Sequence, residues 1–148
     1  MAIKKYQKHI ITEFKPGLEL PEFRGKPGVP NDRANFMMWL GDGVLKGSPY
    51  TEAVWLWPGA ANPKGGFPQH AHEHNEIIGF FGTDTKNVYD LGGEIEFWLE
   101  DEKYMLRKSC LLFIPGGMKH CPIVFRRIDR PIFHFLMEMG GAYTEKNK

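Results

Sequence analysis

The feature that most restricts the fold of this chain is a succession of short segments rich in aromatic and β-branched residues, each ended by glycine, proline or aspartate. Such segments are typical of β-strands, because these side chains pack well on a pleated surface while Gly and Pro favour turns. The segments are 35–41, 50–59, 76–82, 94–100, 104–117, 121–131 and 132–141. Helical patterns are scarce, so the sequence predicts an all-β sandwich, jelly roll or barrel.

The segment 35–41 is open to two interpretations. Asn31 and Asp32 could cap a short helix that runs to Trp39, because both residue types are good N-caps. The same side chains fit a strand equally well. The Asp-Gly pair that follows directly, at 42–43, favours a hairpin.

Residues 15–33 hold four of the 11 prolines of the chain. Proline fixes φ and lacks a backbone donor, so this stretch is neither helix nor central strand. We expect an extended, proline-rich N-terminal arm over residues 1–34, a β-barrel over 35–142 and a frayed tail over 143–148. An arm of this kind suits strand exchange between subunits, so we also expect a homodimer.

Composition excludes several classes of function. With 148 residues and a net charge of +1, the chain has the size of one domain and no basic stripe, so we expect no nucleic-acid partner. It contains no apolar run long enough for a membrane helix, and its first residues lack the apolar core of a secretory signal. We therefore expect a cytoplasmic protein in which Cys110 and Cys121 are reduced packing residues.

The stretch "HAHEHNE" places His70, His72, His74 and Glu76 at alternate positions. In a straight strand these side chains would share one face, but His70 and Glu76 would lie roughly 20 Å apart. Ligands of one metal ion all lie within about 2.0–2.6 Å of it. Glu76 can join the two leading histidines only if the chain turns at residues 73–75, which would leave His74 on the turn and pointing away from the ion.

A second stretch, "IPGGMKH", ends at His120, which lies 44 residues after Glu76. Pro115 would end one strand, and Gly116 with Gly117 would permit a tight turn. His120 would then begin the next strand. Cys121, as its neighbour in that strand, should face the opposite way.

Together the two stretches resemble the paired motifs of the cupin family. The first motif, His-x-His followed by a glutamate between two glycines, is matched by "GFPQHAHEHNEIIGFFG". The second is matched in "SCLLFIPGGMKHCPIV" by Pro115, Gly117 and His120. Ser109 and Val124 stand where the family has glycine and asparagine, and the spacing of the flanking glycines in the first motif is one residue shorter on each side. These departures fall outside the histidines and the glutamate, and the resemblance covers roughly residues 50–139.

The resemblance implies a cupin jelly-roll β-barrel with one divalent transition metal inside it. By that resemblance the ligands are His70, His72, Glu76 and His120. Three imidazoles and a carboxylate suit Mn, Fe, Zn, Co or Ni. Four protein ligands on a six-coordinate ion leave two positions for a bidentate substrate, which is the arrangement of a catalytic site.

Two further residues are candidates for proton transfer. His134 lies between Ile132 and Leu136 on one strand face, where it is either a satisfied core histidine or part of the barrel lining. Glu52 is the acid that we would test as a general base. Arg126, Arg127 and Arg130 could clamp a substrate carboxylate, or they could form an exposed turn; their sequence does not separate the two.

Three functions fit this set of residues. The first is a Lewis-acid hydrolase, lyase or isomerase acting on a small oxygen-rich substrate, for example one that opens a cyclic 1,3-diketone with water. The second is an iron-dependent dioxygenase with the same ligands. The third is a non-catalytic cupin that binds a small molecule. A metallo-β-lactamase-like hydrolase is disfavoured, because "HAHEHN" lacks the Asp-His pair of that signature.

Overall fold

The structure is a computed structural model that describes residues 2, 4–15, 29 and 31–140. Over these ranges it is nearly all β, as predicted, with two short 3-10 helices at Gln7–His9 and Pro58–Ala60 and no α-helix. The strands are β1 (Ala34–Leu40), β2 (Tyr50–Leu56), β3 (Glu76–Phe81), β4 (Asp90–Leu99), β5 (Glu102–Lys108), β6 (Cys110–Ile114), β7 (His120–Ile128) and β8 (Ile132–Glu138).

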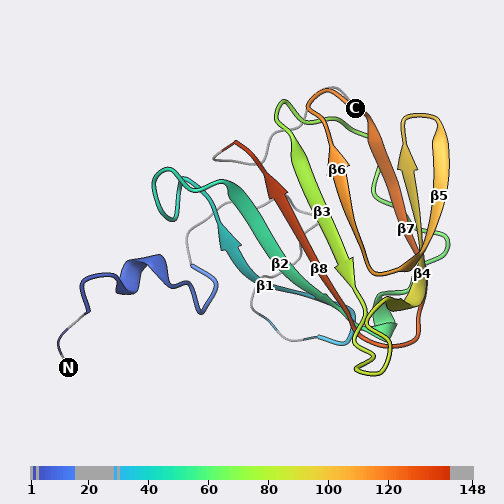
Figure 1. Cartoon of the computed structure of the whole chain (residues 1–148), viewed down its shortest axis with the longest axis horizontal. Coiled ribbons are helices and arrows are strands. Elements are labelled where there is room, and N and C mark those ends of the chain that lie inside the picture. Colours follow the sequence, from blue (N-terminus) through green and yellow to red (C-terminus); the bar gives the residue numbers. More distant parts are fainter. Residues whose placement is uncertain (1, 3, 16–28, 30, 141–148) are drawn as a thin grey trace.

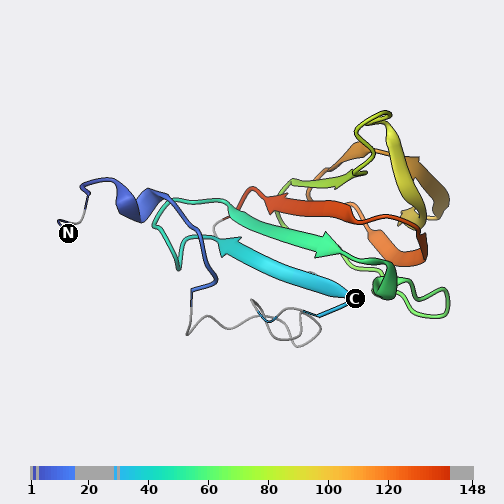
Figure 2. The ribbon, with the colours of Figure 1, turned by 90° about the horizontal axis from the view of Figure 1, so that it is seen from below.

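The strands form two antiparallel sheets that face each other as separate layers (Figures 1 and 2). The larger sheet has the order β1-β2-β8-β3-β6, and the smaller has the order β5-β4-β7. Because β8 inserts between β2 and β3, strands distant in sequence become neighbours. The pattern of short strands left a sandwich, a jelly roll or a barrel open, and this arrangement agrees with the jelly-roll barrel that the cupin resemblance implied.

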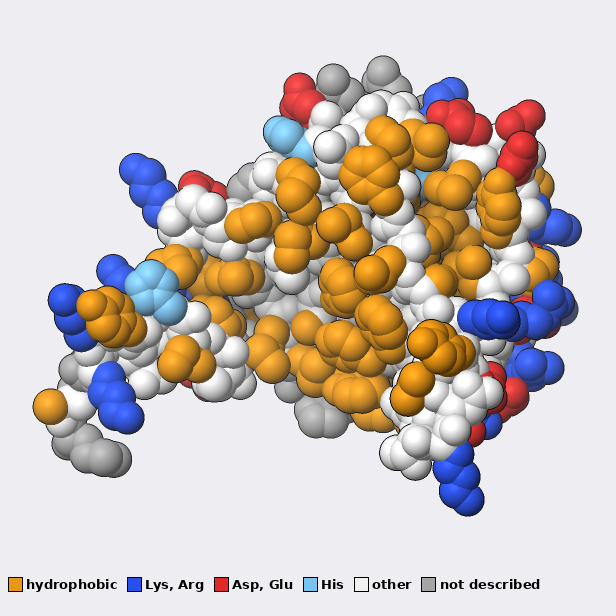
Figure 3. Space-filling view, in the orientation of Figure 1, with side chains coloured by type: hydrophobic (Ala, Val, Ile, Leu, Met, Phe, Trp, Pro, Cys, Tyr) orange, Lys and Arg blue, Asp and Glu red, His pale blue; other side chains and the backbone are white. Residues whose placement is uncertain are grey.

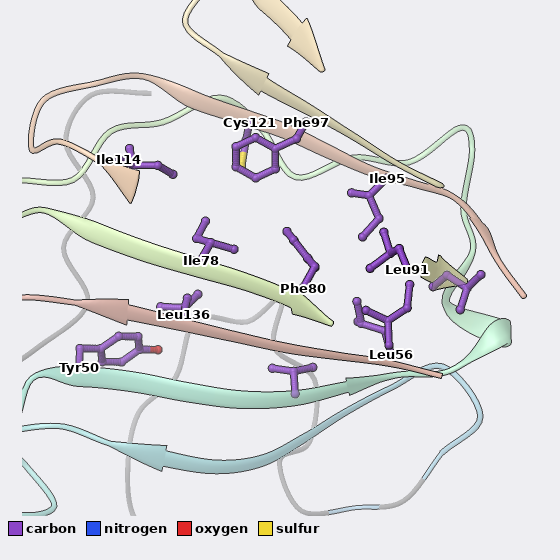
Figure 4. Packing of buried hydrophobic residues seen from close by; sticks show 13 residues of the cluster. Tyr50, Leu56, Ile78, Phe80, Leu91, Ile95, Phe97, Ile114, Cys121 and Leu136 are labelled. Carbon is purple, nitrogen blue, oxygen red and sulfur yellow. The ribbon is translucent and has the colours of Figure 1, made fainter. Parts of the chain in front are cut away.

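The core fills the space between the two sheets. Ile78 and Leu136 point inward from the larger sheet, and Ile95 and Phe97 meet them from the smaller one (Figure 4). Phe97 and Ile95 are fully buried, so these positions contribute the apolar burial that stabilises the two-layer fold.

The open alternative at the first segment is resolved in favour of the strand. Residues Ala34–Leu40 form β1 and pair antiparallel with β2, from Ala34 opposite Leu56 to Leu40 opposite Thr51. The two strands form a hairpin, as the Asp-Gly pair indicated. Its connection, residues 41–49, has nine residues and is therefore longer than the two-residue turn that Asp42-Gly43 suggested. The interpretation as a short helix to Trp39 is wrong, because the backbone N–H and C=O groups of this segment pair with β2 instead.

Strict alternation on β2 and β8 decides which residues enter the barrel. On β2 every second residue from Tyr50 to Leu56 is buried, which includes Glu52. On β8 the buried positions are Ile132, His134, Leu136 and Glu138. Two carboxylates and one imidazole of these two strands therefore face the interior of the barrel.

The opposite faces of the same strands carry an apolar outer surface. Trp55 and Phe133 are half-buried there and make an edge-on ring contact at 5.3 Å between centroids. Trp57 stacks on Trp55. Figure 3 shows hydrophobic side chains gathered over this face of the larger sheet. These three aromatic residues are thus outside the core and away from the barrel interior, whereas Phe97 is inside.

Most of the proline-rich stretch, residues 16–28 and 30, and the tail 143–148 lie outside the described residues. The arm and the division at residues 1–34, 35–142 and 143–148 therefore stay predictions. Across the ranges that are described, no helix is long and apolar enough to cross a membrane.

Candidate metal centre

The two histidine motifs lie side by side because their backbones are hydrogen-bonded to each other. The His70 N–H donates to the His120 carbonyl at 3.0 Å, and the His120 N–H donates to the His70 carbonyl at 2.9 Å. This antiparallel bridge links positions that are distant in sequence and places both side chains at the same level of the barrel.

The chain turns inside the first motif, as the distance argument required. Glu73 and His74 form a bend between the bridge at His70 and the start of β3 at Glu76. The side chain of Asn75 fixes the bend, because its Oδ1 accepts a hydrogen bond from the Gly116 N–H at 2.9 Å.

The glycine turn of the second motif is bound to the first motif as well. Gly117 has a φ of +87°, in the left-handed region that glycine adopts without strain. Its N–H donates to the His72 carbonyl at 2.9 Å. The two turns therefore hold each other in place beneath the histidine side chains.

Four buried side chains converge at this point. His70 Nε2 lies 3.2 Å from His72 Nε2, and His72 Nε2 lies 3.2 Å from Glu76 Oε2. His120 Nε2 lies 3.1 Å from the same carboxylate oxygen. One ligand atom from each histidine lies within 4.8 Å of the other two. The structure thus brings together all four residues that the cupin resemblance singled out.

Backbone carbonyls orient two of the imidazoles. His70 Nδ1 lies 2.8 Å from the Pro68 carbonyl oxygen, and His120 Nδ1 lies 3.1 Å from that of Met118. A carbonyl accepts but cannot donate, so each Nδ1 carries the proton. Each Nε2 then presents its lone pair to the centre, which is the orientation that a metal-binding histidine needs.

Burial also sets the charges that the centre carries. It lowers the pKa of His70 from 6.5 to about 4, against the hydrogen bond to Pro68, which raises it. Burial alone would raise the pKa of Glu76, but the imidazoles of His120 and His72 beside its carboxyl group outweigh this and lower the pKa to about 2. Near neutral pH the site therefore combines a neutral His70 with a charged Glu76.

These residues fit a divalent metal ion. His120 Nε2 and Glu76 Oε2 are buried, and neither has a partner of hydrogen-bonding geometry in the part of the chain that the structure describes. A buried polar atom without such a partner is costly, and a cation between the two would satisfy both. Imidazole nitrogen and carboxylate oxygen are also the donors that divalent transition metals accept.

A cavity of about 340 Å³ opens on the centre from inside the barrel. His70, Glu76 and His120 line it, and His134 lines it from β8. The His134 Nδ1 lies 3.0 Å from the Gly79 carbonyl oxygen, and its ring stacks on Phe80 at 4.5 Å between centroids. Of the two interpretations of His134, the structure supports a buried residue that is also part of the barrel lining.

Glu52 lies elsewhere in the same interior. It is buried, and the Tyr50 hydroxyl donates a hydrogen bond to its carboxylate. Glu52 does not line the cavity that opens on the histidines. His74 lies on the bend, with a side chain that is 43% exposed, and is not part of the histidine cluster.

Sequence reasoning missed Glu138, a fully buried acid at the end of β8. Its Oε2 lies 3.9 Å from His72 Nδ1, and its Oε1 lies 3.5 Å from His74 Nδ1. Alternation along "IFHFLME" could have found it, because the pattern that turns His134 inward also turns Glu138 inward.

The expectation that Cys121 faces away from His120 is wrong. Cys121 is buried and lines the same cavity (Figure 4). Its φ of +71° is outside the extended region, and the pairing of β7 with β4 shifts register at this point. The irregular backbone breaks the alternation on which the expectation depended. Cys110 is half-buried, and burial raises the pKa of its thiol, which suits a packing residue.

The three arginines are engaged with acids of this chain. Arg126 forms an ion pair with Glu96, Arg127 with Asp129 and Arg130 with Asp90. None of the three lines the cavity. Of the two interpretations, the structure places them on the outside of the barrel.

No protein-family model matches this chain, and no curated protein does either. Solved structures do match. KdgF from Halomonas sp. has a TM-score of 0.44 and 17% identity over 71% of this chain and 76% of that one. A structure of the DMSP lyases RdDddP and RnDddQII has a TM-score of 0.43 and 15% identity over 69% of this chain and 45% of that one.

An RmlC-like cupin family protein with a double-stranded β-helix fold, from Methanocaldococcus jannaschii, matches with a TM-score of 0.42 and 12% identity, over 63% of this chain and 71% of that one. A cupin-family protein is thus among the solved structures that this chain matches. This chain spans less than half of the DMSP lyase chain.

Proposed function

We propose that this chain is a cupin enzyme that depends on one divalent transition metal and acts, without redox change, on a small substrate that binds through carbonyl or hydroxyl oxygens. The observation that carries the proposal is the convergence of three imidazole Nε2 atoms and the Glu76 carboxylate at the inner end of a cavity. A divalent metal held there would supply Lewis-acid activation of the substrate oxygens.

In this proposal His70, His72, Glu76 and His120 hold the metal, which is Mn, Fe, Zn, Co or Ni. The site is ready for a cation near neutral pH, because the pKa of Glu76 is lowered to about 2 and that of His70 to about 4. Neither group must lose a proton before it can donate its lone pair.

His134 is the residue that we assign to proton transfer. The Gly79 carbonyl keeps the proton on its Nδ1, so Nε2 is the basic nitrogen, and the stack on Phe80 fixes the ring plane. From the cavity wall it could accept a proton from a substrate or a water molecule and return it later. Glu52 is the second candidate: it is buried inside the barrel, but its carboxylate accepts from Tyr50 and it does not line the cavity.

Hydrolysis, elimination and isomerisation all fit this assignment, because each needs substrate oxygen atoms that are polarised at one point and a base that lines the same cavity. Hydrolytic opening of a cyclic 1,3-diketone is a concrete case. There Glu76 and the three histidines would stay ligands, and His134 would handle the proton of the attacking water. The ring would lie in the remainder of the cavity.

Turnover without oxygen tests the proposal. Metal-free protein is reconstituted separately with Mn, Fe, Co, Ni and Zn under strict anaerobiosis and incubated with a panel of cyclic 1,3-diketones, whose enol absorbance is lost on ring opening. We expect at least one metal to support turnover at the same rate with and without air. His72→Ala protein, treated with the same metal, is the control and should be inactive.

Two results would contradict this assignment. Activity that requires both iron and O₂ would replace it with a dioxygenase that uses the same ligands. Stoichiometric metal and tight ligand binding, with no chemical change in any compound of the panel, would favour a cupin that only binds a small molecule.

A further inference from the structure

The wall of the cavity is hydrophobic apart from five polar side chains and two glycines, among the residues described as lining it. Three of the polar residues, His70, Glu76 and His120, belong to the metal-binding end. The other two lie away from it: His134 is level with Phe80, four residues along β3 from Glu76, and Asn62 is bonded to the Phe125 carbonyl on β7. Both are already engaged within the protein, His134 Nδ1 with the Gly79 carbonyl and Asn62 Oδ1 with the Gly65 N–H. Beyond the metal-binding end a ligand therefore meets mostly hydrophobic side chains.

No lysine or arginine is among the described residues that line this cavity. Arg126 directly follows the wall residue Phe125 in the sequence. Its guanidinium pairs with Glu96 and donates to the Pro63 carbonyl at 3.0 Å. A negative charge on the substrate outside its metal-binding group would thus meet apolar side chains and no cationic side chain. Burying such an unpaired charge is strongly unfavourable.

Aromatic rings reach the cavity from several segments of the fold. Phe36 comes from β1, Phe97 from β4 and Phe125 from β7, and Phe67 comes from the connection that leads to the first motif. Figure 4 shows Phe97 pointing into the space between the sheets, opposite Ile78. Walls of this kind recognise a ring or a branched hydrocarbon by shape and by displacement of water.

The connection that carries Phe67 is held to the barrel. The Asn62 N–H donates to the Phe125 carbonyl at 2.8 Å, and the Phe67 N–H donates to the Ile123 carbonyl at 3.1 Å. This wall is therefore tied to β7, so the apolar shape of the cavity is present before a ligand enters.

The apolar wall disfavours a sugar. A free sugar would place hydroxyl groups against the phenylalanines that line the cavity, without hydrogen-bond partners, and burying such groups unpaired is costly.

We infer that the substrate carries its metal-binding oxygens at one end of an otherwise neutral, apolar body, such as one aromatic or alicyclic ring. It is not a polyol, and it carries no carboxylate or phosphate apart from its metal-binding group. This inference rests on the proposed function and narrows it, because the oxygen-rich part of the substrate is confined to the metal-binding end.

Three hydroxamates that share one chelating group test the inference on the full chain loaded with Co(II). Acetohydroxamate has only a methyl group beside the chelating group. Benzohydroxamate has a neutral ring there, and 4-carboxybenzohydroxamate has the same ring with a negative charge. Their Kd values are measured by calorimetry, and the visible absorption of the cobalt reports whether each one reaches the metal. We expect benzohydroxamate to bind at least tenfold more tightly than either of the other two.

Two variants locate the effect. Phe125→Ala should reduce the preference for benzohydroxamate over acetohydroxamate at least threefold, and Phe36→Ala provides a second measurement at a different wall position if the first variant is unfolded by circular dichroism. Phe113→Ala is the matched control, because that ring lies on β6 and is 62% exposed. The control should keep the full preference.

The outcomes separate the two claims. Equal affinities for the three compounds, tightest binding of the carboxylated one, or an unchanged preference in folded Phe125→Ala or Phe36→Ala protein would overturn the inference while the metal site stands. If Co(II) does not load, or no hydroxamate alters its spectrum, the proposed function fails, and the inference that rests on it fails as well.

Discussion

The Glu138 carboxylate lies 3.9 Å from Nδ1 of His72, across the imidazole ring from the Nε2 that approaches Glu76. An acid behind a metal-binding histidine fixes the direction of the ring and strengthens its donor nitrogen. Glu138 is fully buried, on a strand whose register is set by both β2 and β3. It is therefore placed to act through His72 rather than on a substrate.

Glu138→Gln should weaken metal binding by about tenfold or more, the effect expected when the partner of a metal-binding histidine is lost. The measurement is a competition titration with a coloured chelator. Glu94→Gln is the control, since Glu94 pairs with Arg107 in an exposed ion pair on β4 and should leave the Kd unchanged. A Kd for Glu138→Gln equal to that of the parent protein would remove Glu138 from the site.

His120→Ala should lose stoichiometric metal, because it deletes one nitrogen of the buried cluster, the one that lies 3.1 Å from the Glu76 carboxylate. Metal content is read by elemental analysis after dialysis against buffer without chelator. His74→Ala should keep its metal, because His74 is 43% exposed and outside the cluster. Full metal content in His120→Ala would show that the ligand assignment is wrong.

His134→Asn should lower kcat by about 10²- to 10⁴-fold, the usual contribution of a general base, while metal content stays the same. Asparagine can still donate to the Gly79 carbonyl but cannot take up a proton. The alkaline and acidic limbs of the pH–rate profile are compared on whichever diketone the parent protein opens. If Glu52→Gln has the larger effect on kcat and His134→Asn has none, the base is Glu52.

The metal-free protein should lose stability as the pH falls from about 6.5 to about 4. Across this window an unfolded chain protonates His70, whereas in the folded protein burial lowers its pKa to about 4. The unfolded state binds more protons, so the free energy of unfolding rises with pH here. The total for this residue is at most about 3 kcal/mol, since one pKa unit is about 1.36 kcal/mol. Glu76, with its pKa of about 2, adds a loss of the same sign at still lower pH.

Urea denaturation of the metal-free protein at pH 7.0, 5.5 and 4.5 measures this dependence. His70→Gln should show a flatter profile over the same range, because glutamine does not titrate. A parent protein whose unfolding free energy is constant from pH 7.0 to 4.5 would contradict the environment assigned to His70.

Light scattering of the full chain should give a mass of twice 17.0 kDa. The apolar outer surface of the larger sheet supports a homodimer. Leu111 and Phe113 on β6 are 65% and 62% exposed, and Trp55 on β2 and Phe133 on β8 of the same sheet are half-buried. Large exposed apolar patches of this kind commonly mark interfaces. A mass of one chain at micromolar concentration would show that this prediction is wrong.

Only part of the histidine centre was predictable from local spacing. Spacing places His70 and His72 on one face, and the short reach of a metal requires a turn before Glu76. His120 was included through the resemblance to the paired cupin motifs. The all-β class was likewise predictable from the recurring short segments. Neither conclusion needed knowledge of which strands are neighbours.

Other parts of the site depend on pairing and on irregular backbone, which the sequence does not reveal. Alternation indicates that Glu138 faces inward, but its contact with His72 depends on the position of β8 between β2 and β3, which the sequence does not reveal. Cys121 enters the cavity because its φ is +71°. Trp55 faces outward because the alternation of β2 turns Val54 and Leu56 inward. The size of the tryptophan side chain alone would have suggested that it lies in the core.

The reciprocal hydrogen bonds between His70 and His120 have a consequence for how an ion would enter. They close a long loop of chain by backbone contacts alone, so the entropy of bringing the two motifs together is lost during folding and not during binding. Binding of the ion would then require little further ordering of the backbone. After its release the barrel would stay folded, with the donor atoms in position to bind another ion.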